Sequence, residues 1–163
     1  MTDKANAGAP RPGEPGPDER RKRGMDMMGR VYGWEVKDGP GDFFAVTVDH
    51  LFGEIWTRPG LSIRDRRLLV LGVLAAQGQV DLADVQVRAA LGNGELGPGQ
   101  LREAALFLTH YVGWPLGASL AMRVDAVLGE AERAERKARR DAGQEAGREA
   151  GESAPRDAAG SAG

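Results

Sequence analysis

The chain consists of stretches with apolar residues at helical spacing, separated by short polar or glycine-rich breaks. The stretch from Leu68 to Ala76 is apolar nearly all round, as in a helix that is buried on every side. Ser62 and Asp65 precede it at the spacing of a capping box, in which two side chains satisfy free backbone amides at a helix start. This pattern predicts a central helix that begins after Ser62.

Three helices are expected after the central helix. Asp81 is a candidate cap for the first of them, which ends at Asn93 and Gly94 because these residues tolerate left-handed backbone. Pro98 suits the first turn of the second helix, which Gly113 ends. The third helix begins at Pro115. In each helix, apolar residues recur at helical spacing: Leu82, Val85 and Ala89 in the first; Leu101, Ala104, Ala105, Leu108 and Val112 in the second; and Leu116, Leu120, Val124 and Val127 in the third.

Two earlier helices are expected, over about residues 19–31 and 40–56, and we find no strand alternation of useful length. The predicted fold class is therefore all-α, a compact bundle of about six helices. Residues 18–135 form its domain. Residues 1–17 and 136–163 are expected to be tails, the second charged and rich in Gly and Ala, because such compositions bury little apolar area.

Composition excludes several classes of function. The 163 residues carry 22 basic and 24 acidic side chains, a net charge of -2, so no positive excess favours nucleic acid. The basic run 20–23 has no interleaved aromatic residues and is interpreted as a solvated helix face. Cysteine is absent, which removes disulfide and thiolate chemistry. No apolar run reaches the roughly 20 residues that span a membrane. We expect a cytoplasmic protein with no membrane, metal or cofactor partner.

One string in the chain is specific enough to suggest a family. It runs from Gly53 to Arg66 and contains Trp56-Thr57-Arg58-Pro59-Gly60-Leu61. This string resembles the helix end and turn before the central helix in the carboxymuconolactone decarboxylase family. Further matching pieces follow the family order over about residues 20–128, namely 23–33, Arg88-Ala89-Ala90-Leu91 with Asn93-Gly94, Leu101-Arg102-Glu103, and Tyr111-Val112-Gly113-Trp114-Pro115.

The resemblance implies an all-α fold of the alkylhydroperoxidase D type, assembled as a trimer or hexamer. It implies loss of carbon dioxide from 4-carboxymuconolactone, an intermediate of aromatic-compound degradation. Decarboxylases of the family use a histidine in the segment that here runs from Val85 to Arg88. Gln86 occupies that position. The peroxidase branch uses a pair of cysteines and is excluded as a mechanism.

Decarboxylation needs a cation that holds carboxylates and an acid that returns a proton. Arg58 is a candidate for the first role, and Glu54, Glu103 or His110 for the second. Each has an alternative. Glu54 and Arg58 are four residues apart and could form a surface ion pair. Glu103 could cap or pair with neighbouring arginines, and His110 could simply end a helix at its negative pole.

Glu103 and His110 are seven residues apart, which corresponds to about 10.5 Å of helical rise, so they cannot form a direct dyad.

The candidate substrate-binding residues are Trp56, Gln86, Tyr111 and Trp114. An amide can orient a ligand through hydrogen bonds, but it is neither an acid nor a base. The aromatic residues could equally be core or subunit-contact residues.

Three hypotheses remain open. The chain is a decarboxylase-like enzyme acting on a carboxylated lactone or related small acid, a catalytically reduced oligomer that binds a small carboxylated or aromatic-derived ligand, or a scaffold protein. If the family pocket is present, we expect the Gln86 side chain to point into it and the protein to be inactive or very slow with 4-carboxymuconolactone. Gln86→His then restores some activity if Arg58 and the pocket still fit the substrate.

Overall fold

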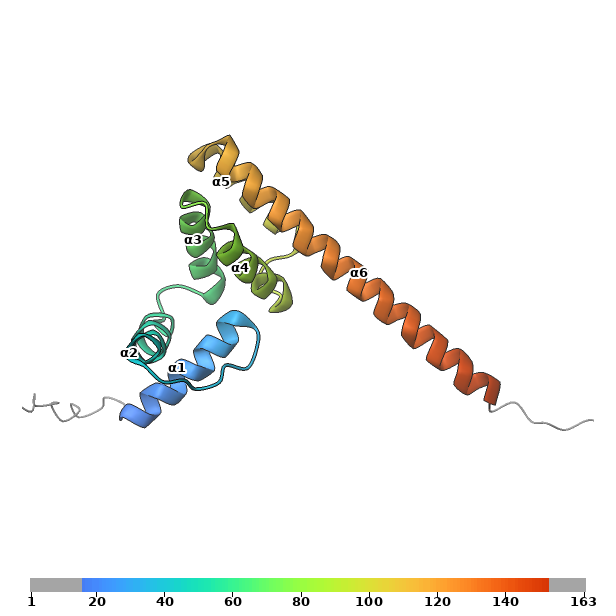
Figure 1. Cartoon of the computed structure of the whole chain (residues 1–163), viewed down its shortest axis with the longest axis horizontal. Helices are drawn as coiled ribbons and strands as arrows, with labels where there is room; N and C mark the ends of the chain where they lie inside the picture. The colour runs from blue at the N-terminus through green and yellow to red at the C-terminus, as the bar shows by residue number, and fades with distance from the viewer. Residues whose placement is uncertain (1–15, 153–163) are drawn as a thin grey trace, which may run out of the picture. The chain divides into compact units, whose positions relative to one another are not determined.

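The computed structural model describes residues 16–152, with side chains described for residues 16–145. Within this range the chain forms helices and no strands, which confirms the all-α class. The elements, labelled in Figure 1, are α1 (Pro17–Tyr32), α2 (Asp42–Val46), η1 (Thr47–Ile55), α3 (Ile63–Ala76), α4 (Val80–Gly92), α5 (Pro98–Val112) and α6 (Trp114–Glu152).

Local signals in the sequence set several helix ends correctly. The hydroxyl of Ser62 accepts a hydrogen bond from the backbone amide of Asp65, whose carboxylate accepts one from the Ser62 amide, so the capping box is formed. After α4, Gly94 takes a left-handed backbone with φ of 67°. Gly113 has φ of 89° and separates α5 from α6. These conformations are accessible mainly to glycine.

The expected cap at Asp81 is wrong. The residue that precedes α4 is Gln79, and its side chain makes no capping hydrogen bond. Asp81 lies in the first turn, where its carboxylate is 3.2 Å from a guanidinium nitrogen of Arg123 on α6. The carboxylate therefore joins two helices instead of capping one.

The helix expected over residues 40–56 is divided into two kinds of helix. The short α2 passes directly into η1, a π-helix in which the Trp56 amide donates to the Leu51 carbonyl five residues earlier, at 2.9 Å. Val48, Phe52 and Gly53 are buried on η1. Their spacing of four and five residues places them on one face of a π-helix, but a spacing of four fits an α-helix as well.

α1 packs against η1 at very short range. Gly24 is buried on α1, and a Cβ atom added there would overlap the Val48 backbone, lying 2.8 Å from its carbonyl carbon. Beyond this contact, a core cluster forms from Val31, Phe52 and Trp56, with Met27, Met28, Tyr32, Ile63 and Val70 packed around it.

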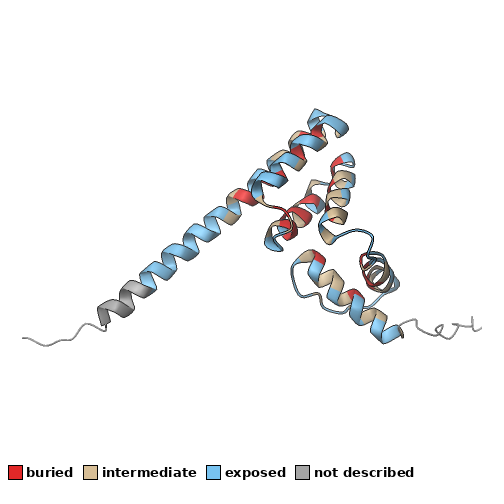
Figure 2. Ribbon diagram, turned by 180° about the vertical axis from the view of Figure 1, so that it is seen from behind, coloured by how far each residue is buried: buried red, intermediate tan, exposed pale blue. Residues whose placement is uncertain are grey.

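α3 packs against α4 and α5. Its buried stripe consists of Arg67, Leu71 and Ala75, which follow one another every four residues. On another side Leu69 and Val73 are 62% and 54% exposed. The expectation that this helix is buried on every side is therefore wrong for the single chain, because its neighbours leave the side with Leu69 and Val73 uncovered. Figure 2 shows the mixture of buried and exposed positions on these helices.

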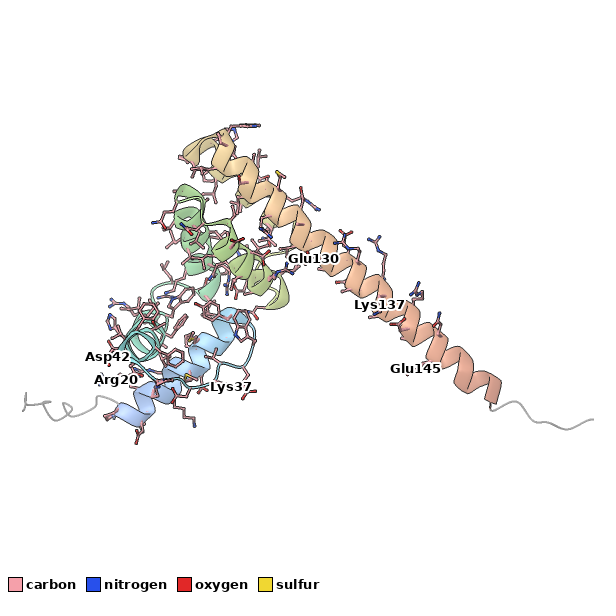
Figure 3. The ribbon with its side chains drawn as sticks, in the orientation of Figure 1. Arg20, Lys37, Asp42, Glu130, Lys137 and Glu145 are labelled. Atoms are coloured by element: carbon pink, nitrogen blue, oxygen red, sulfur yellow. The ribbon has the colours of Figure 1, made fainter. Side chains whose placement is uncertain are left out.

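The chain divides into two units, residues 1–124 and 125–163, and α6 contributes to both. In the first unit, Gly117 of α6 lies against Thr109 of α5, where a Cβ atom would overlap the threonine side chain. In the second, every described side chain from Glu132 to Glu145 is exposed, as Figure 3 shows for Lys137 and Glu145.

Helix α6 continues to Glu152, within the stretch 136–163 that is expected from the sequence to be a tail. Alanine and charged residues favour helix even without a buried face, and Glu132 and Arg136 form an ion pair one turn apart. Of the expected N-terminal tail, residues 1–17, the first 15 lie outside the described residues.

Candidate functional site

Gln86 lies in the middle of α4, in the first unit, and is only 8% exposed. Its side-chain oxygen accepts a hydrogen bond from a guanidinium nitrogen of Arg67, Nη1, at 2.6 Å. Arg67 belongs to α3 and is fully buried, with an exposure of 0%. Gln86 is therefore in direct contact with a buried cation.

Arg67 donates three further hydrogen bonds, and all of their acceptors lie outside α3. Its Nε donates to Glu95 at 2.6 Å, and its Nη2 donates to the other carboxylate oxygen of Glu95 at 2.9 Å. Nη2 also donates to the Val31 carbonyl at the end of α1, at 2.5 Å. A guanidinium and a carboxylate that meet in this two-pronged geometry form one of the stronger pairings in proteins.

Glu95 is held in place by the loop between α4 and α5. The Asn93 side-chain amide donates to Glu95 at 3.0 Å and to the Arg30 carbonyl at 2.7 Å. The loop, α1, α3 and α4 are thus joined through one network. Every buried side-chain nitrogen and oxygen in the described part of the chain has a hydrogen-bond partner, so this network has no unsatisfied group aimed at a ligand.

Tyr32 lies at the edge of the same network. Burial raises the pKa of its hydroxyl, and the positive charge of Arg67 opposes this shift. The Tyr32 ring stacks on Trp34 with centroids 5.1 Å apart and meets Phe52 edge-on. Tyr32 of α1 thus lies between the charge of Arg67 and a group of aromatic rings.

Sequence reasoning missed Arg67. A signal was available, because Arg67 lies four and eight residues before the apolar Leu71 and Ala75 and so shares their face. The neighbouring Arg64 and Arg66 obscured this signal, because the residue type alone does not distinguish a buried arginine from an exposed one.

Glu54 and Arg58 make their contacts with residues other than Gln86. Glu54 on η1 is 2.8 Å from His50 and 3.6 Å from Arg20. The hydrogen bond with His50 lowers the pKa of Glu54, with smaller contributions from Arg20 and Arg23. Arg58 is exposed, and its carbonyl accepts a hydrogen bond from Arg66. The alternative of a Glu54–Arg58 surface pair is not observed, since Glu54 pairs with other residues.

The remaining candidates divide between core and surface. Trp56 is 8% exposed and stacks on Phe52, with ring centroids 5.9 Å apart, which favours the core interpretation. Tyr111 and Trp114 are 75% and 70% exposed at the junction of α5 and α6. His110 is also exposed, and its Nδ1 is 2.9 Å from the Leu106 carbonyl of its own helix.

Glu103 lines an open groove of about 870 Å³ between α3 and α5. The groove has mostly apolar walls, with Arg64, Gln100 and Glu103 as its polar side chains. Its other lining residues are Leu68, Leu69, Gly72, Val73, Ala76, Leu96, Gly99, Ala104, Phe107 and Leu108. Neither Gln86 nor Arg58 lines it.

The described residues contain neither a cluster of metal ligands nor a membrane-spanning helix. No group of three or more His, Asp or Glu side chains in this range is placed to hold a metal ion. None of the helices described is long and apolar enough to cross a membrane.

Comparisons with known proteins agree on one family. The model of the carboxymuconolactone decarboxylase family matches residues 41–125. A 4-carboxymuconolactone decarboxylase from Acinetobacter baylyi is 30% identical over 106 residues, which cover 60% of this chain and 78% of that protein. A nitrosuccinic acid decarboxylase from Metarhizium robertsii is 38% identical over 66 residues, 39% of this chain and 44% of that protein. The chain therefore belongs to the carboxymuconolactone decarboxylase family.

Proposed function

We propose that the chain is a decarboxylase-like protein that acts on a small carboxylated acid bound in the groove between α3 and α5. The observation that carries this proposal is the composition of the groove, which combines apolar walls with Arg64 and Glu103. A cavity of several hundred Å³ with a few polar groups is typical of small-molecule sites.

The names of the two relatives support this class of substrate. 4-Carboxymuconolactone and nitrosuccinic acid are both carboxylic acids that also carry an electron-withdrawing group, a lactone carbonyl in one case and a nitro group in the other. Arg64 is suited to hold a carboxylate. The apolar walls fit the carbon skeleton of such an acid.

Loss of carbon dioxide breaks the bond between the carboxylate carbon and its neighbour. The electron pair stays on the substrate, where the carbonyl or nitro group delocalises it, and a proton is then added to carbon. Gln86 cannot supply this proton because an amide does not exchange it near neutral pH. Glu103 is the acid of the sequence hypothesis that lines the groove, and we assign it the proton transfer.

The test is release of carbon dioxide by the unmodified chain from 4-carboxymuconolactone and, separately, from nitrosuccinic acid. We expect Arg64→Gln to raise KM and Glu103→Gln to lower kcat by about 10²-fold or more. Arg102→Gln changes an exposed residue beside Glu103 that does not line the groove, and it should leave the rate unchanged.

Arg58→Gln separates this proposal from the sequence hypothesis. If Arg58 holds the carboxylate, this variant loses activity and Arg64→Gln does not. That result would remove the groove from the reaction.

A second candidate is a catalytically reduced protein that binds such an acid without converting it. The observation that favours it is the hydrogen bond between Gln86 and Arg67, which leaves no proton donor at the family's histidine position. Titration calorimetry distinguishes the two, since this candidate predicts heat of binding with no carbon dioxide released.

A further inference from the structure

We propose that Arg67 and Gln86 form a matched pair, in which the buried guanidinium requires a hydrogen-bond acceptor at position 86 and so excludes a protonated imidazole there. The inference goes beyond the proposed groove activity, because it concerns the buried stripe of α3 and none of the groove residues. It also revises the expectation that Gln86→His restores a proton donor by itself.

The hydrogen-bonding capacities of the two groups are complementary. A guanidinium has only donors and stays charged in proteins, so the side chain that meets it must present an acceptor. Gln86 meets Arg67 through its oxygen at 2.6 Å. A neutral imidazole can accept this hydrogen bond through one ring nitrogen, whereas a protonated imidazole has donors on both nitrogens.

The side chain at position 86 faces a positive charge. Gln86 contacts Arg67 of α3. Arg67 in turn contacts Glu95 of the loop before α5, and its charge acts on Tyr32 of α1. Both carboxylate oxygens of Glu95 already accept hydrogen bonds from Arg67. A proton on residue 86 would therefore place a second positive charge against a buried cation whose counter-ion is already engaged.

Both side chains of the pair are buried. Gln86 is 8% exposed and Arg67 is 0% exposed, so water screens the repulsion between two such charges only weakly. Burial and a neighbouring like charge both favour the neutral form of an imidazole. The glutamine at position 86 and the arginine at position 67 are thus matched in hydrogen bonding and in charge.

The direct experiment is Gln86→His, followed by NMR titration of the new imidazole. The chain has two histidines of its own, so the third set of signals is assigned by comparison with the unmodified protein. We expect a pKa at least roughly one unit below the ordinary value of about 6.5, and no gain in carbon dioxide release. A pKa at or above 6.5 overturns the proposal.

The double variant Gln86→His with Arg67→Gln supplies the opposite expectation. Removing the cation takes away the like charge that disfavours the protonated imidazole, so its pKa should rise by more than about one unit relative to the single variant. No rise would show that Arg67 does not control the proton at position 86.

A second measurement covers the case in which the double variant does not fold. Gln86→Met keeps the side-chain length but removes the acceptor, while Gln86→Glu keeps an acceptor. We expect the melting midpoint of the Met variant to lie roughly 2–8 °C below that of the Glu variant at pH 7. Equal midpoints, or a higher one for Met, would contradict the required acceptor.

These outcomes are distinguishable from those of the groove proposal. Loss of activity in Arg64→Gln and Glu103→Gln tests the groove, whereas the imidazole pKa and the melting midpoints test the pair without any substrate.

Discussion

Arg67 is a buried cation that the fold surrounds completely. Its partners come from α1, α4 and the loop before α5, so it joins segments that are distant in the sequence. A buried ion pair stabilises a protein little relative to an apolar replacement of the whole pair, but removal of one partner is costly. The reason is that the remaining charge loses both its solvent and its counter-ion.

At the residue scale, we predict that Arg67→Met lowers the free energy of unfolding by about 3–5 kcal/mol. The loss arises because Glu95 is left without its cation and Gln86 without its donor. Urea unfolding measures it. The matched control is Arg88→Met on α4, whose exposed side chain pairs with Asp84 and whose removal should cost no more than about 1 kcal/mol. Equal losses in the two variants would refute the role of the buried network.

The sequence alone does not separate Arg67 from the arginines beside it. Arg64 is exposed and lines the groove, while Arg67 is fully buried. Helical spacing identifies the face on which each lies, but not the helix that covers this face. The functional contrast between these two residues therefore depends on the packing of α3 between α4 and α5.

At the element scale, the capping box of α3 predicts a pH-dependent stability. Hydrogen bonds from Ser62 lower the pKa of Asp65. A lowered pKa in the folded state stabilises the fold above the ordinary aspartate pKa, and this stabilisation is lost as the pH falls through the lowered value. Ser62→Ala should therefore lower the melting midpoint by roughly 2–5 °C at pH 7 and by less in acid.

The control for this prediction is Ser119→Ala. The Ser119 hydroxyl is exposed and donates to the Pro115 carbonyl within α6, so its removal should leave the melting midpoint nearly unchanged at both pH values. A loss that is the same in acid as at neutral pH would show that the Asp65 charge does not contribute.

The contact between α1 and η1 gives a second prediction at this scale. Gly24→Ala introduces a methyl group into the space of the Val48 backbone, and overpacking of this kind costs about 1–3 kcal/mol. Gly92→Ala is the control, because a Cβ atom at that helical position has no neighbour within 4 Å. Thermal unfolding should show a loss for the first variant and no loss for the second. An unchanged midpoint for Gly24→Ala would mean that the two helices can separate.

The π-helix was beyond sequence reasoning for a physical reason. Val48 and Phe52 are four residues apart, a spacing that suits an α-helix, and the wider winding only becomes visible in the hydrogen bond from Trp56 to Leu51. Such windings have an intrinsic cost and are retained where packing favours them. Here the close approach of Gly24 to Val48 is part of that packing.

At the scale of the whole molecule, the first unit leaves many large apolar side chains uncovered. Leu69, Leu106, Phe107 and Met122 are between 52% and 74% exposed. Soluble proteins rarely leave large contiguous apolar patches open to water, and association of subunits is a common way of covering them.

We predict from this exposure that the protein is a homo-oligomer, and the family resemblance implies a trimer or hexamer. Light scattering should give at least three times the chain mass of 17.4 kDa. Met122→Glu, in the first unit, should weaken association because it places a charge on an apolar face. Lys137→Glu is the control, since this side chain lies in the exposed part of α6 (Figure 3). A monomer in dilute solution, or equal effects of the two variants, would contradict the prediction.

What the sequence determined by itself is the local structure. The all-α class and the helix ends at Ser62, Gly94 and Gly113 follow from hydrogen bonds and backbone angles that depend on residues within one turn of each other. The tertiary structure decided which side chains meet. Arg67 contacts Gln86 and Glu95 across separations of 19 and 28 residues, and the groove joins residues of α3 and α5. Such contacts depend on how helices pack, and a periodic pattern along one helix contains no information about its neighbour.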